Sequence, residues 1–404
     1  MTWTQHLTLC QSDRGFDLTM KAKALAHYVG EDMIPKVNKK QALQNTVPAD
    51  VDLVEWYYEK GFSDGLPVVP PTPEKVDAML EELGGEIGSV ICRVPPRLGT
   101  LTAEVLAVNL VMAGCKPAYA KVVRAALIAL TDNAFNLNGV QATTHMASPL
   151  LVVNGPVRSE IGMNSGYNTF GSGNRANATI GRAVRMVLLN VGGAWPGDLD
   201  KSTLGSPAKY AYCIAENEED SPFVPYHVDK GHDVSDSTVF VMAAEPPHSV
   251  TNHISDDPEG VLESVASAMS TFANNNAVSG GHCAIVLGPE HAKTISSKGW
   301  SRSDIRNFLW MYSGNCFGDI AFNHRYGKVY NRNLPKWYKR GINDRIPIVS
   351  SPDHIHLFVA GGEAGRFSAF IPGWGHMTNP VLSSVSGLPA TMTDTLCNDE
   401  SCKY

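Results

Sequence analysis

The sequence lacks any long apolar run and any block of basic residues. No stretch approaches the roughly 18–20 apolar residues that a membrane-spanning helix needs, so we expect no membrane role. The first residues also lack a basic segment followed by an apolar core, which argues against a secretory signal and for a cytoplasmic protein. With 40 acidic and 33 basic side chains the formal net charge is −7, and this charge argues against nucleic-acid binding.

Cysteine is sparse and shows no motif. The eight cysteines of the 404 residues include no CxxC spacing, and a disulfide scaffold would be shorter and richer in cysteine, so we expect reduced thiols. Cys397 and Cys402 could pair or bind a soft metal, but incidental thiols in a polar tail are the commoner case. There is also no GxSxG sequence, so serine-based hydrolysis has no support.

Short apolar strands alternate with helical patterns along the chain. Residues 150–154, 237–243 and 283–287 are typical of buried strands, and residues 73–83 and 258–274 predict helices. We therefore expect an α/β or α+β fold, a mixed sheet with packed helices that could divide into two subdomains. The expected division is an N-terminal extension over 1–50, an α/β domain over 51–220 and a second α/β half over 221–404.

The segment MAGCKPAY at 112–119 places a cysteine at a predicted helix corner. Gly114 is a natural left-handed end for a buried helix over 102–113, and Pro117 suits the start of a second helix that continues to residue 130. Cys115 would then lie near a helix N-terminus, where the dipole and Lys116 favour a thiolate. Cys115 is therefore a candidate nucleophile. The alternative is a small buried residue that fills a tight corner.

A glycine-rich loop at 162–174 leads into a predicted helix over 176–190. Gly171 and Gly173 make the loop flexible, and Asn174 can cap the helix. Exposed N–H groups at a helix N-terminus attract anions, and Arg175 and Arg182 would add donors for a carboxylate or phosphate. We expect these five residues to bind the substrate.

Two other interpretations of this loop stay open. The spacing Gly171-x-Gly173-x-x-Ala176 matches the short form of the dinucleotide-binding fingerprint, but no apolar strand leads into it, and such a match alone is weak. The glycines could also serve only to let the helix pack closely. We favour a small-anion site.

Two further residues are candidates for proton transfer. His145, in the segment QATTH before a predicted strand, is placed to act as a general acid or base. If it meets Cys115, the two form a nucleophile and its base, although the spacing does not prove that they meet. Glu216 could donate a proton or bind a metal, but a solvated acidic loop is the commoner case. Its neighbour Cys213 is the poorer nucleophile, because nearby carboxylates raise a thiol pKa.

Histidines of the second half raise the alternative of a metal site. His354 and His356 alternate along a predicted strand and so share one face. They could bind a divalent transition metal, but the sequence names no third ligand. Two other pairs are five residues apart instead of the four of a helical metal pair, and these are His227 with His232 and His248 with His253. The cofactor is therefore unknown, with a divalent metal as the candidate.

Several longer segments carry a resemblance to a known group of proteins. They are WYYEKGFSDGLPVVPP at 56–71, MAGCKP, QATTH, GSGNRANATIGRAVR, YCIAENEE and GPEHA at 288–292. In this order they resemble the long proteins associated with UGSC-motif (seleno)proteins, over roughly residues 52–371. The resemblance implies a link to thiol or selenol redox chemistry and to cleavage of carbon–heteroatom bonds. The chain has no UGSC motif, and SGNC at 313–316 is only a distant echo, so the redox residue could lie on a small partner protein.

These observations together predict an enzyme that acts on a small anionic, carboxylate-type substrate. We expect a lyase or hydrolase that cleaves or rearranges a carbon–heteroatom bond with a thiolate/His pair. One alternative is a metal-dependent lyase or hydrolase that uses the histidines of the second half. Another is a non-catalytic partner subunit of a small redox (seleno)protein. The apolar helices also make a homo-oligomer plausible.

Overall fold

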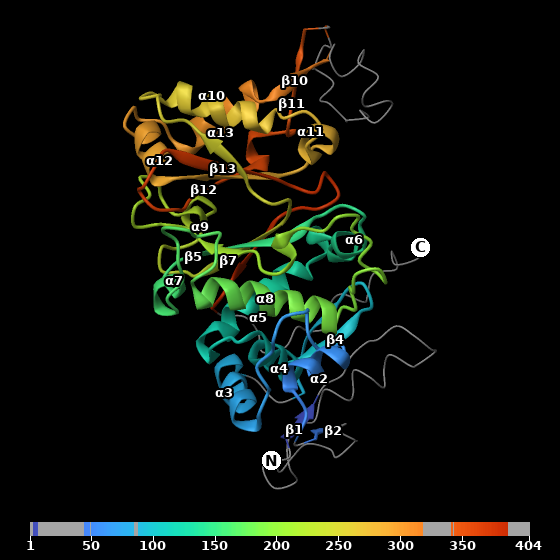
Figure 1. Cartoon of the computed structure of the whole chain (residues 1–404). Coiled ribbons are helices and arrows are strands. Elements are labelled where there is room, and N and C mark those ends of the chain that lie inside the picture. The colour runs from blue at the N-terminus through green and yellow to red at the C-terminus, as the bar shows by residue number, and fades with distance from the viewer. Residues whose placement is uncertain are drawn as a thin grey trace.

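The computed structural model describes residues 3–6, 44–48, 50–84, 88–317, 341 and 343–386. Most of the expected 1–50 extension, together with Cys397 and Cys402, lies outside these residues. Two four-stranded sheets pack face to face, and helices cover the outer face of each sheet (Figure 1). The expectation of an α/β or α+β fold is confirmed. Within the described ranges, no helix is long and apolar enough to cross a membrane.

The first sheet has the strand order β14-β7-β5-β6. Its strands are β5 (Ser148–Asn154), β6 (Cys213–Ala215), β7 (Thr238–Ala244) and β14 (Val381–Ser384). Strand β5 pairs parallel to β6 and antiparallel to β7, and β7 pairs antiparallel to β14. Because β5 and β6 precede residue 220 while β7 and β14 follow it, this sheet does not follow the expected division there.

The second sheet has the strand order β12-β9-β13-β8. Its strands are β8 (His248–Thr251), β9 (Cys283–Leu287), β12 (Ile355–Val359) and β13 (Phe367–Pro372). Strand β12 pairs parallel to β9, and β13 pairs antiparallel to both β9 and β8. Strand β9 spans the five residues that the sequence predicts, because a short run of buried β-branched and aliphatic residues is a local signal.

Alternation along the strands explains the layers. In β5, Leu151 and Val153 join the core on the helix side, whereas Leu150 and Val152 face the second sheet. Helices α4 (Ala103–Ala113), α5 (Ala120–Leu130) and α8 (Arg175–Asn190) cover the first sheet. Helices α10 (Pro258–Met269), α12 (Pro289–Ser296) and α13 (Arg302–Tyr312) cover the second. Strands β5 and β7 are therefore buried on both faces along their whole length.

The remaining described elements are shorter or lie at the periphery. The helices are α2 (Leu53–Glu59), α3 (Pro73–Leu83), α6 (Leu137–Ala142), α7 (Val157–Glu160), α9 (Tyr226–Asp229) and α11 (Asn275–Ser279). The strands are β1 (Trp3–His6), β2 (Gln44–Val47), β3 (Val90–Val94), β4 (Gly99–Thr102), β10 (Gly314–Cys316) and β11 (Arg345–Pro347). Ser301 and Asp304 form the predicted capping box at the start of α13.

One end of the two sheets gathers several polar side chains. Strands β5, β6, β9 and β12 begin there, and β7 and β13 end there, since the N–H of Glu245 donates to the carbonyl of Pro372 at 2.8 Å. His145 precedes β5, His282 precedes β9 and Glu245 follows β7. Residues far apart in the sequence therefore come together at this end.

Candidate functional site

The corner at Cys115 has the backbone geometry that the sequence predicts. Helix α4 ends at Ala113, and Gly114 follows in the left-handed region at φ 89°. The N–H of Gly114 donates to the carbonyl of Val111, and the N–H of Cys115 donates to the carbonyl of Leu110 at 3.0 Å, which is the Schellman arrangement. The amide of Cys115 therefore completes α4 and is not free to stabilise an anion.

The sulfur of Cys115 lies in the interior. The residue is 6% exposed, and its Sγ donates to the carbonyl of Thr179 in α8 at 3.3 Å. Burial raises the pKa of this thiol to about 12, although the charges of Arg175 and Arg182 lower it. The expectation of a lowered pKa is therefore wrong, because the loss of hydration outweighs the nearby positive charges. At neutral pH Cys115 is a protonated thiol.

His145 pairs with a carboxylate instead of with Cys115. Its Nε2 lies 2.7 Å from Oε1 of Glu245, because the antiparallel pairing of β5 with β7 brings the start of one strand to the end of the other. No hydrogen bond or ion pair joins His145 to Cys115. The structure therefore gives His145 an orienting carboxylate but not the nucleophile that the sequence suggested.

Glu216 is a buried carboxylate that accepts hydrogen bonds from four different segments of the chain. Its Oε1 accepts from Nη2 of Arg302 at 2.8 Å and from the N–H of Val359 at 3.3 Å. Its Oε2 accepts from Nδ2 of Asn154 at 2.5 Å and from the N–H of Tyr226 at 2.7 Å. The residue is 0% exposed, so the expected solvated loop is wrong. With both oxygens occupied, this carboxylate holds neighbouring elements together and is poorly placed for proton donation or metal binding.

The glycine-rich loop leads into α8 as predicted. Asn174 is the N-cap, and its side chain accepts the N–H three residues further on at 3.0 Å. Gly171 and Gly173 are exposed, and Gly173 has φ 118°. Arg175 donates from Nε to the carbonyl of Gly114 at 3.0 Å, so it binds the end of α4. An anion-binding role for this loop stays a prediction.

Arg182 is occupied by a different partner. Its Nε and Nη2 donate to the two carboxylate oxygens of Asp64 at 2.9 and 2.8 Å. Its Nη2 also donates to the carbonyls of Leu66 and Pro67 at 3.1 and 2.9 Å. The side chain of Asp64 is only 3% exposed. These contacts give Arg182 the role of tying α8 to the turn at 64–67, and the expected role in substrate binding is corrected accordingly.

Three histidines meet at the polar end of the second sheet. His282 and His354 precede parallel strands, and their ring centroids lie 4.1 Å apart. Nε2 of His356 lies 3.0 Å from Nδ1 of His282. Among the residues that the structure describes, however, no group of three or more His, Cys, Asp or Glu side chains could hold a metal ion. That finding covers both His227 with His232 and His248 with His253.

Hydrogen bonds fix the state of two of these histidines. Oδ1 of Asn379 accepts from Nε2 of His282, so Nδ1 of His282 is the acceptor for the N–H at Nε2 of His356. Nδ1 of His356 then accepts from the hydroxyl of Tyr226 at 2.8 Å. Burial lowers the pKa of His282 to about 4 and holds the pKa of His356 well below its usual range. Both imidazoles are therefore neutral.

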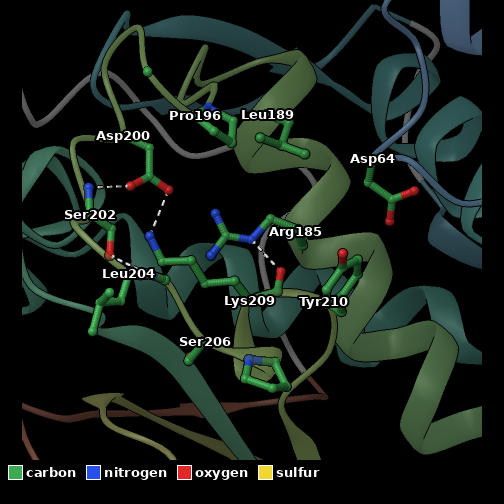
Figure 2. Close-up of a pocket in the computed structure, with 13 residues that line it drawn as sticks. Asp64, Arg185, Leu189, Pro196, Asp200, Ser202, Leu204, Ser206, Lys209 and Tyr210 are labelled. Carbon is green, nitrogen blue, oxygen red and sulfur yellow. Dashed lines mark hydrogen bonds and ion pairs between the residues drawn. The ribbon is translucent and has the colours of Figure 1, made fainter.

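A pocket of about 500 Å³ lies beside α8 (Figure 2). This volume is in the range of small-molecule sites. Arg185 enters it from α8, Lys209 from a short 3-10 helix (Pro207–Lys209), and Asp200 from the loop between them. These three side chains point toward one another in Figure 2. The pocket also has apolar walls, including Leu204 and Tyr210.

Arg185 is the least satisfied charge in the pocket. The residue is 7% exposed, and its Nε donates to the carbonyl of Lys209 at 2.9 Å. Neither Nη1 nor Nη2 makes a hydrogen bond to a described residue. Burial lowers the pKa of Arg185 to about 10, while Asp200 and Asp64 raise it, so the guanidinium is charged at neutral pH. Nearby, Oγ of Ser206 is buried and also has no hydrogen-bond partner among the described residues.

Lys209 and Asp200 form a pair beside Arg185 in the pocket. Nζ of Lys209 donates to Oδ2 of Asp200 at 2.6 Å, and the N–H of Ser202 donates to Oδ1 at 3.0 Å. Burial lowers the pKa of Lys209, and the charge of Arg185 adds to this effect, whereas Asp200 opposes it. Asp200 and Asp64 compensate the charge of Arg185 only in part, because they are also bound to Lys209 and Arg182.

Arg185 is not among the site residues predicted from the sequence, although it lies three residues after Arg182 in the segment GRAVR. The available signal was the run of arginines at helical spacing in α8. Which of them faces a pocket depends on the loop at 196–210, and nothing in the sequence showed where that loop packs. The N–H of Thr203 in this loop donates to the carbonyl of Thr144 at 2.9 Å, which sets the pocket next to the segment that carries His145.

Comparisons with known proteins add no relative. No protein-family model matches the chain, and no curated protein matches it. The resemblance to the proteins associated with UGSC-motif (seleno)proteins thus remains a prediction from the segments quoted above.

Proposed function

We propose that the chain is an enzyme that acts on a small carboxylate, which binds in the pocket against Arg185. The observation that carries this proposal is the side chain of Arg185, which is 7% exposed and whose Nη1 and Nη2 open onto the pocket without a hydrogen-bond partner among the described residues. A cation that is mostly out of water and open only toward a pocket favours an anion there. A carboxylate is the natural partner, because its two oxygens match the guanidinium fork.

The charges and the lining of the pocket limit which class of ligand can bind there. The lining carries two positive side chains, Arg185 and Lys209, and two negative ones, Asp200 and Asp64. Because Asp64 is bound to Arg182, one positive charge is left for a monoanion to balance. The orphan hydroxyl of Ser206 offers a further donor. Leu189, which is 6% exposed, supplies apolar wall, which suits a short hydrocarbon body. The ligand that fits best is a small monocarboxylate.

The pocket also carries groups for proton transfer. Lys209 and Asp200 lie 2.6 Å apart, so a proton can pass between amine and carboxylate as a substrate reacts. Cleavage or rearrangement of a carbon–heteroatom bond remains the reaction class that we favour. Cys115 has no part in this proposal, since its thiol is protonated and buried.

The two alternative functions have less support. A metal-dependent enzyme lacks a ligand set among the described residues, although the meeting of His282, His354 and His356 was partly expected. A partner subunit of a small redox protein rests on the resemblance alone. Neither alternative accounts for the buried guanidinium.

Calorimetric titration with propionate tests the proposal. We expect saturable binding to the intact chain, and we expect Arg185→Gln to weaken it by about tenfold to a hundredfold, the value of hydrogen bonds to a charged group. Lys201→Gln is the matched control, because Lys201 is exposed and lies on the same loop. Unchanged affinity in Arg185→Gln, with thermal unfolding showing that this variant is folded, would contradict the proposal.

A further inference from the structure

We propose that the pocket accepts 2-oxo acids and that Nζ of Lys209 captures their carbonyl carbon as an imine. This inference rests on the proposed function, because it takes the carboxylate to be held at Arg185. It adds a substrate class and a covalent step. Two observations lead to it: the position of the amine of Lys209 and the proton acceptor beside it, Asp200.

The position of Lys209 fits a ligand with two adjacent reactive groups. In a 2-oxo acid the carbonyl carbon is bonded directly to the carboxylate carbon. The protein groups that recognise them must therefore also be neighbours. Arg185 and Lys209 enter the same pocket and point toward one another (Figure 2), and Nε of Arg185 is anchored on the backbone of Lys209. A carboxylate on the guanidinium would place its 2-oxo carbon toward the amine.

The pocket can supply the unprotonated amine that attack requires. Burial and the charge of Arg185 lower the pKa of Lys209 despite the opposing effect of Asp200, and a lowered pKa is how lysines become nucleophiles in proteins. Oδ2 of Asp200, at 2.6 Å, is placed to accept the proton. The N–H of Ser202 holds the other oxygen of this carboxylate. Lys201 on the same loop is exposed and donates to the carbonyl of Gly197. It therefore has neither the buried environment of Lys209 nor a bond to a carboxylate.

The step balances without a redox partner. Lys209 gives a proton to Asp200, and the nitrogen lone pair attacks the carbonyl carbon, so that a C–N bond forms. The oxygen takes the proton from Asp200, and the nitrogen returns one to it, which leaves a neutral carbinolamine. The C–O bond then breaks as the hydroxyl leaves with the proton of Asp200 as water. The product is a protonated imine, and Asp200 is ionised again.

Such an imine would serve the favoured reaction class. Its positive nitrogen withdraws electrons through the imine carbon, so that a proton on carbon 3 of the former 2-oxo acid becomes acidic. Loss of this proton gives an enamine, from which a heteroatom substituent further along the chain can depart. Asp200 lies beside the nitrogen and is the group placed to move that proton.

Reductive trapping with pyruvate is the test. The intact chain is incubated with pyruvate and sodium cyanoborohydride, and the modified residue is located by peptide mass mapping. We expect one adduct per chain, on Lys209. Lys209→Arg should abolish this adduct, whereas the matched control Lys201→Arg should keep it. Arg185→Gln should slow adduct formation with pyruvate at least tenfold more than with propanone, which has no carboxylate and depends on Arg185 only through the pKa of Lys209.

The outcomes separate this inference from the proposed function. No adduct in the wild-type chain, or adducts spread over exposed lysines without preference for Lys209, would overturn the imine. If propionate still binds and depends on Arg185, the proposed function survives that result. If propionate does not bind either, both fail. Mapping on the wild-type chain decides the matter even if Lys209→Arg does not fold.

Discussion

Burial favours the neutral form of both residues that matter most here, but it leaves them in different charge states at pH 7. For the thiol of Cys115, burial favours the neutral form and raises the pKa to about 12. For Arg185, burial lowers the pKa only to about 10, so the side chain keeps its charge at pH 7. A buried neutral thiol requires no counter-charge, whereas a largely buried cation is stabilised by a nearby anion. The site therefore forms around the arginine.

The state of Cys115 predicts its reactivity. In the native chain at pH 7.5, we expect iodoacetamide to leave Cys115 unmodified, because the thiolate is the reactive form and the sulfur is covered. Cys316, which is more exposed, is the internal comparison, and peptide mapping reads both sites. Cys115→Ala should bind propionate as the wild type does. Rapid alkylation of Cys115 without unfolding would show that its thiolate is accessible after all.

Helix α8 distributes three arginines to different partners. Arg175 and Arg182 are seven residues apart, so they lie within about 20° of each other around the helix axis. Both face the corner of α4 and the turn at 64–67. Arg185 is rotated by about 60° from Arg182, which is enough to bring it into the pocket. One helix thus provides both structural and ligand-binding positions.

This division of roles predicts a difference in stability. Arg182→Met should lower the free energy of unfolding by about 3 kcal/mol, because it leaves the buried carboxylate of Asp64 without its partner. Arg175→Met removes one bond at an exposed position and should cost much less. Urea denaturation measures both. Folded Arg182→Met should also bind propionate more weakly, because the freed carboxylate of Asp64 lines the pocket and attracts Arg185. An equal loss of stability in the two variants would contradict the assignment.

Elements that depend on local signals could be predicted from the sequence. Helix α3 begins at Pro73 and ends at Leu83 as predicted, since proline suits the first turn. The left-handed Gly114 and the cap at Asn174 were also predicted correctly. Each of these features depends on residues within a few positions of each other. Periodicity and capping chemistry are enough to place them.

Features that depend on distant contacts could not be predicted in this way. The burial of Cys115 results from the packing of α4 against α8, and sequence spacing does not report it. The pairing of His145 with Glu245 follows from the strand order of the first sheet. The meeting of Arg185 with Lys209 requires the loop between them to fold back onto α8. No local pattern shows these contacts.

At the scale of the whole molecule, the two sheets share one buried layer that contains neutral histidine. His356 packs in this layer against Tyr226 and Phe240. Its Nε2 contacts Nδ1 of His282, which is partly exposed. In the unfolded chain a histidine has a pKa near 6.5, whereas burial lowers the pKa of His282 to about 4 in the folded chain. Between these values the unfolded state binds a proton that the folded state does not.

Stability should therefore depend on pH in a specific window. It is complete above about pH 7 and falls as the pH decreases toward about 4, because protons stabilise the unfolded state over this range. Urea midpoints measured from pH 8 to pH 4.5 test this. His282→Asn should show a shallower decline, and the exposed His248→Asn should decline as the wild type does. If His282→Asn follows the wild-type slope, the neutral chain of histidines does not control it.

The position of a bound carboxylate tests the central claim most directly. A crystal structure of the chain soaked with propionate locates the ligand without any assumption about the reaction. We expect the carboxylate oxygens within about 3 Å of Nη1 and Nη2 of Arg185, inside the pocket shown in Figure 2. An empty pocket, or propionate bound instead at the loop before Arg175, would contradict the account.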